Sequence, residues 1–128
     1  MPIYLDKKDS SFGNGVLGMT IDPDFDKSNF VYIYYTPNKL PTRQSLSRFK
    51  IIGRDSLDFS SEKVILEVPI DPEVSAHTGG SIAWDKNKNL FLSTGDNTVP
   101  FASDVYSTID ETPGLKVYDA QRSAANAH

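Results

Sequence analysis

Alternating or β-branched hydrophobic residues recur in six short stretches of the chain, and clusters of Gly, Pro, Asn and Asp separate these stretches. A period of two places successive side chains on opposite faces, as in a β-strand. The segments 23–29 and 86–89 are rich in turn-forming residues, which favours antiparallel hairpins. The only helix that the composition allows is a tail over 120–127. The sequence therefore predicts strands over residues 16–22, 30–36, 46–52, 63–68, 81–85 and 90–94.

The first two predicted strands are echoed by the last two. Residues 18–22, Gly-Met-Thr-Ile-Asp, align with residues 81–85, Ser-Ile-Ala-Trp-Asp, and the aromatic stretch 30–36 aligns with 89–94. A propeller blade usually repeats at roughly 40 to 50 residues, and long predicted loops at 37–43, 53–62 and 69–77 account for the wider spacing here. Half of a β-sandwich is the alternative architecture.

We therefore predict an all-β fold in one domain over 1–128, which forms a partial β-propeller. Its parts are a four-stranded blade over 16–68, the first hairpin of the next blade over 77–96, and a loop with a possible helical tail over 97–128. A repeat array generally needs at least three units to bury its faces. The chain is therefore expected to be a fragment that associates with further blades or with itself.

Composition excludes several classes of protein. With 38% hydrophobic and 23% charged residues the chain is globular, and a net charge of −4 without a basic cluster argues against nucleic acid as a partner. The absence of cysteine removes disulfides, thiolate zinc sites and cysteine nucleophiles. No apolar stretch approaches the roughly 20 residues of a membrane-spanning helix, and residues 1–8 lack the features of a signal peptide. As written, the sequence predicts a cytoplasmic protein without a membrane span.

Two motifs near the start of the chain have structural explanations. Residues 13–18 match G-x-G-x-x-G, but a dinucleotide-binding turn needs a following helix, and Pro23 prevents one. We interpret these glycines as the start of an inner strand. The run Asp-Pro-Asp-Phe-Asp at 22–26 resembles an EF-hand loop, yet Lys27 and Ile33 occupy the positions of its glycine and bidentate glutamate. We interpret the aspartates as solvated turn residues and predict no metal site.

One constellation has catalytic potential: His-Thr-Gly-Gly at 77–80 and Ser-Thr-Gly-Asp at 93–96, at the same end of a predicted hairpin. If Asp85 pairs with Leu90, Asp96 lies opposite Gly79 and diagonal to His77. Diagonal neighbours in a sheet are about 7–8 Å apart, within reach of a His–Asp hydrogen bond. Asp96 would then fix the tautomer of His77 and stabilise its protonated form, which suits a general base.

Two questions about this constellation stay open at the level of residues. Gly79 and Gly80 leave room either for a flat ligand, such as a cofactor, or for close-packed backbone. His77 and Asp96 also have a purely structural interpretation as a loop histidine and a turn aspartate, because such pairs are common in folded proteins.

Seven stretches, in order along residues 13–126, resemble the glucose/sorbosone dehydrogenase family. The most specific part is HxGG followed by a pair of strands and TGD. The soluble quinoprotein glucose dehydrogenases of this family are six-bladed propellers that use pyrroloquinoline quinone and Ca²⁺ to oxidise an aldose at its anomeric carbon. The stretches are GVLGMTIDPDF (15–25), NFVYIYYTP (29–37), LSRFKI (46–51), EKVILEVP (62–69), HTGGSIAWD (77–85), LFLSTGDN (90–97) and DAQRSAAN (119–126).

The resemblance implies roles for two residues. His77 would take the proton from the sugar hydroxyl as hydride passes to the quinone, and Asp96 would orient it. Gly13 stands where the glucose dehydrogenases have a glutamine, so that contact is lost. The residues that hold the quinone and calcium in the family come from later blades. The resemblance therefore implies that the cofactor-binding residues are mostly absent from this chain, and that it is inactive alone.

The expected partner is a sugar substrate, and an intact parent protein of this family would be periplasmic or secreted. The alternative function is a non-catalytic propeller module that binds carbohydrate or protein, because propellers serve unrelated functions and the fold does not decide among them.

Overall fold

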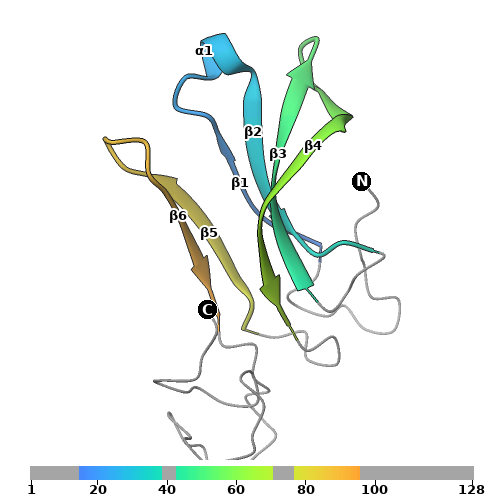
Figure 1. The fold of residues 1–128 in the computed structure, drawn as a ribbon, viewed down its shortest axis with the longest axis vertical. Helices are drawn as coiled ribbons and strands as arrows, with labels where there is room; N and C mark the ends of the chain where they lie inside the picture. The colour runs from blue at the N-terminus through green and yellow to red at the C-terminus, as the bar shows by residue number, and fades with distance from the viewer. Residues whose placement is uncertain (1–14, 39–42, 71–76, 96–128) are drawn as a thin grey trace, which may run out of the picture.

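The computed structural model describes residues 15–38, 43–70 and 77–95, which form two antiparallel sheets and a single helical turn (Figure 1). The first sheet has the strand order β1-β2-β3-β4, and the second is the hairpin β5-β6. This confirms the predicted all-β fold, with one four-stranded blade followed by the first hairpin of the next. The elements are β1 (Val16–Ile21), α1 (Phe25–Ser28), β2 (Phe30–Tyr35), β3 (Arg43–Ile52), β4 (Ser56–Pro69), β5 (Gly79–Trp84) and β6 (Leu90–Thr94).

The structure repeats where the sequence does. Strands β1 and β5 hold equivalent positions, and each is followed by an aspartate that forms the same turn. The carboxylate of Asp22 accepts a hydrogen bond from the backbone N–H of Asp24 at 2.8 Å, and that of Asp85 accepts one from Asn87 at 2.8 Å. An aspartate that accepts from the residue two positions later forms an Asx turn. The predicted turn role of Asp22 is therefore confirmed.

Three predictions for the first blade were wrong: β3 begins at Arg43 rather than at residue 46, β4 begins earlier than expected, and a helical turn lies outside the predicted tail. Residues 53–62 were expected to form a loop, but β4 begins at Ser56, so that only Gly53 to Asp55 connect it to β3. The start of β4 is polar and half-exposed, and it pairs with β3 through backbone hydrogen bonds with two irregularities in register. The turn after β1 contains α1, a helical turn that ends where Asn29 adopts a left-handed conformation with φ of 52°. The predicted tail over 120–127 lies outside the described residues.

The two central strands of the first sheet, β2 and β3, are buried on both faces. On one face Val31, Ile33 and Tyr35 of β2 pack with Phe49 of β3. On the other face lies Tyr34, together with Leu46 and Val68 and with half-buried residues of β5 and β6. Because both sets of alternate positions in β2 are covered, this strand appears in the sequence as an unbroken apolar run. In the described segments, no helix is both long and apolar enough to cross a membrane.

Two buried tyrosines make the stability of the first blade sensitive to alkaline pH. The hydroxyl of Tyr34 donates to Oε1 of Gln44 at 2.6 Å, and that of Tyr35 donates to Glu62. Burial raises the pKa of Tyr34 well above 10, and burial together with the hydrogen bond to Glu62 raises the pKa of Tyr35 to about 12. In the unfolded chain these hydroxyls titrate near pH 10.

We expect the free energy of unfolding to decrease between about pH 10 and pH 12. In that range the unfolded chain loses protons that the folded chain keeps, so that raising the pH favours unfolding. The decrease should be on the order of 1 kcal/mol per tyrosine. Urea unfolding at pH 9 and pH 11 would measure it, and Tyr35→Phe should flatten the pH dependence. An equally steep decrease in Tyr35→Phe would contradict this explanation.

Candidate functional site

The predicted site lies at the start of β5, where three of four consecutive residues have unusual backbone angles. His77 has a φ of 53°, Gly79 of 71° and Gly80 of 119°. A positive φ is easy for glycine but uncommon for other residues, and such strained positions cluster at active sites and ligand-binding sites. The side chain of His77 is exposed. The described structure thus presents the candidate base on the surface, from a backbone conformation that needs support from its surroundings.

That support comes from the end of β6. A Cβ atom added to Gly95 would lie 1.6 Å from the carbonyl oxygen of His77 and 3.1 Å from the backbone N of Thr78. A Cβ atom on Gly79 would lie 2.8 Å from the backbone N of Gly95 and 2.9 Å from the carbonyl oxygen of Ser93. The two backbones are therefore in direct contact at this end of the hairpin.

The next glycine joins the hairpin to the first blade. A Cβ atom on Gly80 would lie 2.7 Å from Cβ of Leu17, and one on Gly18 would lie 1.9 Å from the carbonyl oxygen of Gly80. Of the two uses that the sequence left open for Gly79 and Gly80, the described residues supply close-packed backbone. A ligand beside these glycines stays a prediction.

The predicted hairpin register was wrong by one residue at Leu90 and by two residues at Gly79. Leu90 pairs with Trp84 rather than with Asp85, and the register shifts once more before Gly79, which pairs with Thr94. Asp96 itself lies outside the described residues. Its contact with His77 stays a prediction, and the described neighbour of His77 on this side is Gly95.

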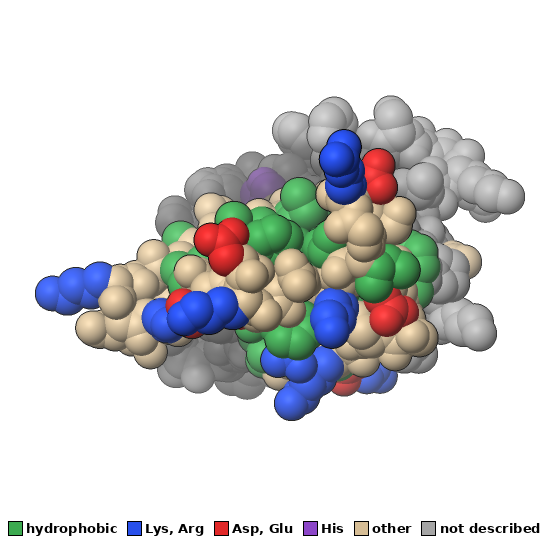
Figure 2. Space-filling view, turned by 90° about the horizontal axis from the view of Figure 1, so that it is seen from above, with side chains coloured by type: hydrophobic (Ala, Val, Ile, Leu, Met, Phe, Trp, Pro, Cys, Tyr) green, Lys and Arg blue, Asp and Glu red, His purple; other side chains and the backbone are tan. Residues whose placement is uncertain are grey.

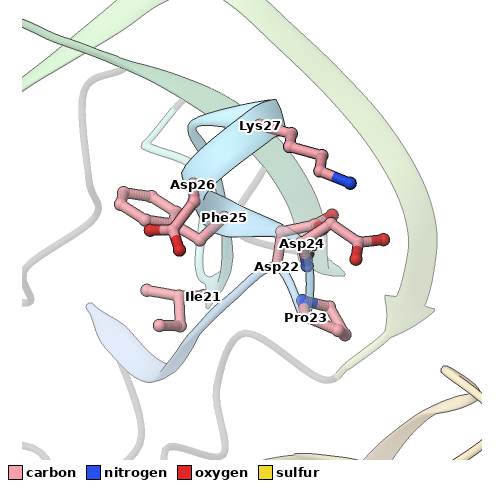
Figure 3. Close-up of a pocket in the computed structure, with 7 residues that line it drawn as sticks. All are labelled: Ile21, Asp22, Pro23, Asp24, Phe25, Asp26 and Lys27. Carbon is pink, nitrogen blue, oxygen red and sulfur yellow. Dashed lines mark hydrogen bonds between the residues drawn. The ribbon is translucent and has the colours of Figure 1, made fainter.

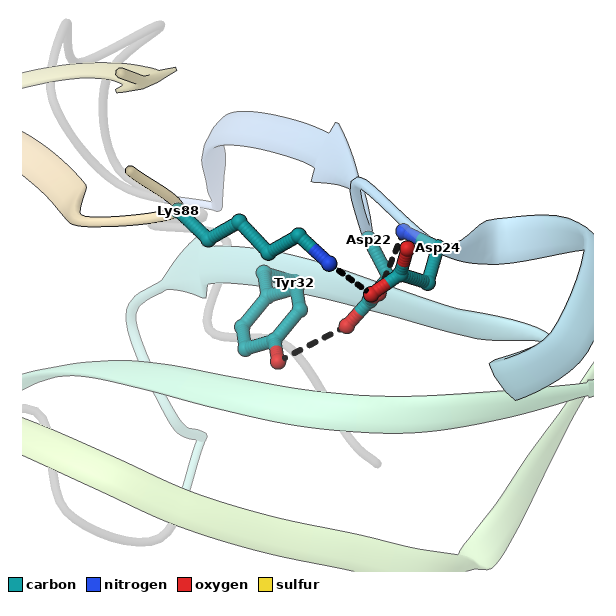
Figure 4. A network of polar contacts seen from close by, with 4 residues as sticks. All are labelled: Asp22, Asp24, Tyr32 and Lys88. Atoms are coloured by element: carbon teal, nitrogen blue, oxygen red, sulfur yellow. Dashed lines mark hydrogen bonds and ion pairs between the residues drawn. The ribbon is translucent and has the colours of Figure 1, made fainter. Parts of the chain in front are cut away.

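The opposite end of the hairpin contacts the first blade through residues that sequence reasoning did not select (Figure 4). The indole N–H of Trp84 donates to the carbonyl oxygen of Ile21 at 2.9 Å, and the Trp84 ring packs edge-on against Tyr32, with 5.1 Å between ring centroids. Lys88 forms an ion pair with Asp24, and its hydrogen bond and positive charge lower the pKa of that carboxyl. Ile21 and Trp84 occupy equivalent positions in the repeat, but the repeat does not predict that they touch.

The acidic turn after β1 surrounds a hollow of about 310 Å³ lined by residues 21–27 (Figure 3). One oxygen of Asp22 accepts from the Asp24 backbone, and the other accepts from the hydroxyl of Tyr32 at 3.2 Å. Asp24 is paired with Lys88. Within residues 15–38, 43–70 and 77–95 no group of three or more His, Asp or Glu side chains could hold a metal ion.

The described residues do not fit a quinone either. Of the described arginines, Arg43 is paired with Glu67 at 2.8 Å, Arg48 lies over the ring of Phe30 at 3.9 Å, and Arg54 is exposed in the turn between β3 and β4, away from the candidate site. The space that Gly79 and Gly80 leave is filled by the backbone of Gly95 and by Leu17. Among the described residues, therefore, no cluster of ligands is present that would hold a divalent cation, and the space beside Gly79 and Gly80 is already filled.

Comparisons with known proteins identify the family of this chain. A model of the glucose/sorbosone dehydrogenase family matches residues 5–114. The chain belongs to this family. A crystal structure provisionally named an oxidoreductase (glucose dehydrogenase), from Thermus thermophilus, is similar at 31% sequence identity and a TM-score of 0.57. The similarity covers 67% of this chain and 25% of that protein. This member of the glucose/sorbosone dehydrogenase family thus spans about a quarter of its structural relative.

Proposed function

We propose that this chain is a segment of a sugar dehydrogenase-like quinoprotein in which His77 acts as general base. The observation that carries the proposal is the left-handed backbone of His77, placed on the surface by contacts with the end of β6. Membership of the glucose/sorbosone dehydrogenase family supports the reaction class. The substrate would be an aldose, oxidised at its anomeric carbon.

The chemistry assigned to this segment is the movement of a proton. Oxidation of a sugar hydroxyl to a carbonyl removes a proton from oxygen and a hydride from carbon. The imidazole of His77 would accept the proton, since one ring nitrogen of a neutral imidazole is a proton acceptor. Asp96, the residue after Gly95, would accept a hydrogen bond from the other ring nitrogen and fix the tautomer of His77. Pyrroloquinoline quinone, the acceptor that the family implies, and its Ca²⁺ would be held by residues beyond those described.

Exposed apolar residues indicate where further blades would lie. Met19 and Ile21 on β1 are 66% and 56% exposed, although their equivalents in the repeat, Ile82 and Trp84, are half-buried against the first blade. Phe91 on β6 is 59% exposed. Viewed from above, hydrophobic side chains lie at the surface between charged ones (Figure 2). We take these residues to be covered by neighbouring blades, from the parent protein or from a second copy, and the isolated chain to be inactive.

The proposal is tested by fusing this chain to the three quarters of the Thermus oxidoreductase that it does not match. With pyrroloquinoline quinone and Ca²⁺ added, the folded fusion should show aldose-dependent dye reduction, and the 128-residue chain alone should show none. His77→Ala should lower the rate by about 10²–10⁴-fold, the usual contribution of a general base.

The matched control is His128→Ala, because His128 is the second of the two histidines in the chain. It should leave the rate unchanged. A fusion that folds but reduces no dye, or one in which His77→Ala keeps the full rate, would defeat the proposal. Binding of a glycan that persists in His77→Ala without quinone would instead favour a non-catalytic module.

A further inference from the structure

We infer that Gly79 and Gly95 are positioning residues for His77, an inference that rests on the proposed role of His77 as general base. Neither glycine would touch the substrate. They act because the absence of their side chains lets the two strands approach each other directly behind the histidine.

The contact at Gly95 is the tighter of the two. Its missing Cβ would lie 1.6 Å from the carbonyl oxygen of His77 and 2.4 Å from the carbonyl carbon. Heavy atoms that are not bonded pack at about 3.5 Å or more. Both contacting atoms belong to backbone, so no side-chain rotation would relieve the overlap. Any residue larger than glycine at this position must move the carbonyl of His77, and with it the imidazole.

Gly79 restrains the same segment from the other strand. Its φ of 71° turns the chain between His77 and β5, and its missing Cβ would meet the backbone of Ser93, Thr94 and Gly95 within 2.9 Å. The residue between the two glycine contacts, Thr78, is buried. His77 is therefore an exposed side chain on a backbone fixed by Thr78, Gly79 and Gly95, which is the rigidity that a catalytic base requires.

The contacts of Gly79 and Gly80 can also be compared with the alternative, in which a ligand approaches the backbone at these two glycines. Glycine serves that purpose when the space of its missing side chain is open toward the ligand. At Gly79 that space is occupied by the partner strand, and at Gly80 it is occupied by Leu17. The described contacts thus favour close packing over ligand approach at Gly79 and Gly80.

The experiment compares Gly95→Ala with Gly53→Ala. Gly53 lies in the turn between β3 and β4, has a φ of 66°, and has nothing within 4 Å of the place a Cβ would occupy. In the active fusion, Gly95→Ala should lower kcat/KM by about 10²-fold, since a displacement of about 1 Å at a catalytic group has such an effect. Gly53→Ala should change kcat/KM by less than about threefold.

A second measurement, on the 128-residue chain, does not depend on activity. The imidazole proton resonances of His77 are assigned by NMR with the help of His128→Ala. Gly95→Ala should shift these resonances, and Gly53→Ala should not. Unchanged His77 resonances in a folded Gly95→Ala chain would overturn the inference.

Should Gly95→Ala fail to fold, the unmodified chain still provides a test. The Hα protons of Gly95 should show a nuclear Overhauser effect to the amide proton of Thr78, and its absence would overturn the inference. A wild-type fusion without dye reduction would defeat the proposed function. The NMR measurements test the contact between Gly95 and the backbone of His77 and Thr78 independently of activity.

Discussion

Gly18→Ala is expected to detach the β5–β6 hairpin from the first blade. The added methyl group would lie 1.9 Å from the carbonyl oxygen of Gly80 and 3.3 Å from Cγ1 of Ile82. The nearest atom is backbone, so the strands β1 and β5 must separate. Forcing extra atoms into a packed site costs typically about 1–3 kcal/mol, and more where the backbone cannot yield. We expect a loss of about 3 kcal/mol or more in the free energy of docking.

Trp84 provides the measurement, because it is the only tryptophan in the chain. In the docked hairpin its ring packs on Tyr32 and its N–H is bonded to Ile21. Undocking would expose the indole to water, so the fluorescence emission of Gly18→Ala should shift to longer wavelength while far-UV circular dichroism still reports the first blade. Gly53→Ala is the control and should keep the wild-type emission. A Gly18→Ala spectrum identical to wild type would show that the hairpin docks without this backbone contact.

Most strands could be predicted from the sequence because buried strand positions are occupied by hydrophobic residues. In β2, Val31 and Ile33 face one core and Tyr32 and Tyr34 face the other, and the run of six apolar residues reflects both. The beginning of β4 has no comparable hydrophobic run. It follows a short turn at Gly53, its residues are mostly polar, and it pairs through backbone atoms that every sequence possesses.

The candidate site was predictable in its residues but not in its geometry. The motifs around His77 and Gly95 are visible in the sequence. The hairpin register, in contrast, includes a shift between Gly79 and Ile82 that no residue type in this segment predicts. The left-handed backbone of His77 could not be predicted either, because it depends on a contact with Gly95, which is 18 residues away along the chain. The hydrogen bond from Trp84 to Ile21 links residues 63 positions apart. Such contacts follow from docking of a hairpin on a blade, which local patterns do not encode.

Phe49→Ala is expected to unfold the first blade rather than to release the hairpin. Phe49 is fully buried in the cluster of Val31, Ile33 and Tyr35. Truncating a buried phenylalanine costs about 3–5 kcal/mol, because it removes apolar contacts and leaves a cavity. Since domains of this size are stable by only about 5–15 kcal/mol, and this sheet is a single blade, the variant should be partly unfolded at 25 °C. The loss should appear as a lower urea midpoint in far-UV circular dichroism.

Phe59→Ala is the matched control for Phe49→Ala. Phe59 packs edge-on against Phe49, with 6.5 Å between ring centroids, but it is 53% exposed. Removing it deletes the same number of atoms from a half-solvated position and should cost about 1 kcal/mol. Equal losses in the two variants would contradict a core centred on Phe49. Gly18→Ala should change the tryptophan emission but not the far-UV circular dichroism, whereas Phe49→Ala should change both. The two variants therefore distinguish the stability of the first blade from the docking of the hairpin that carries His77.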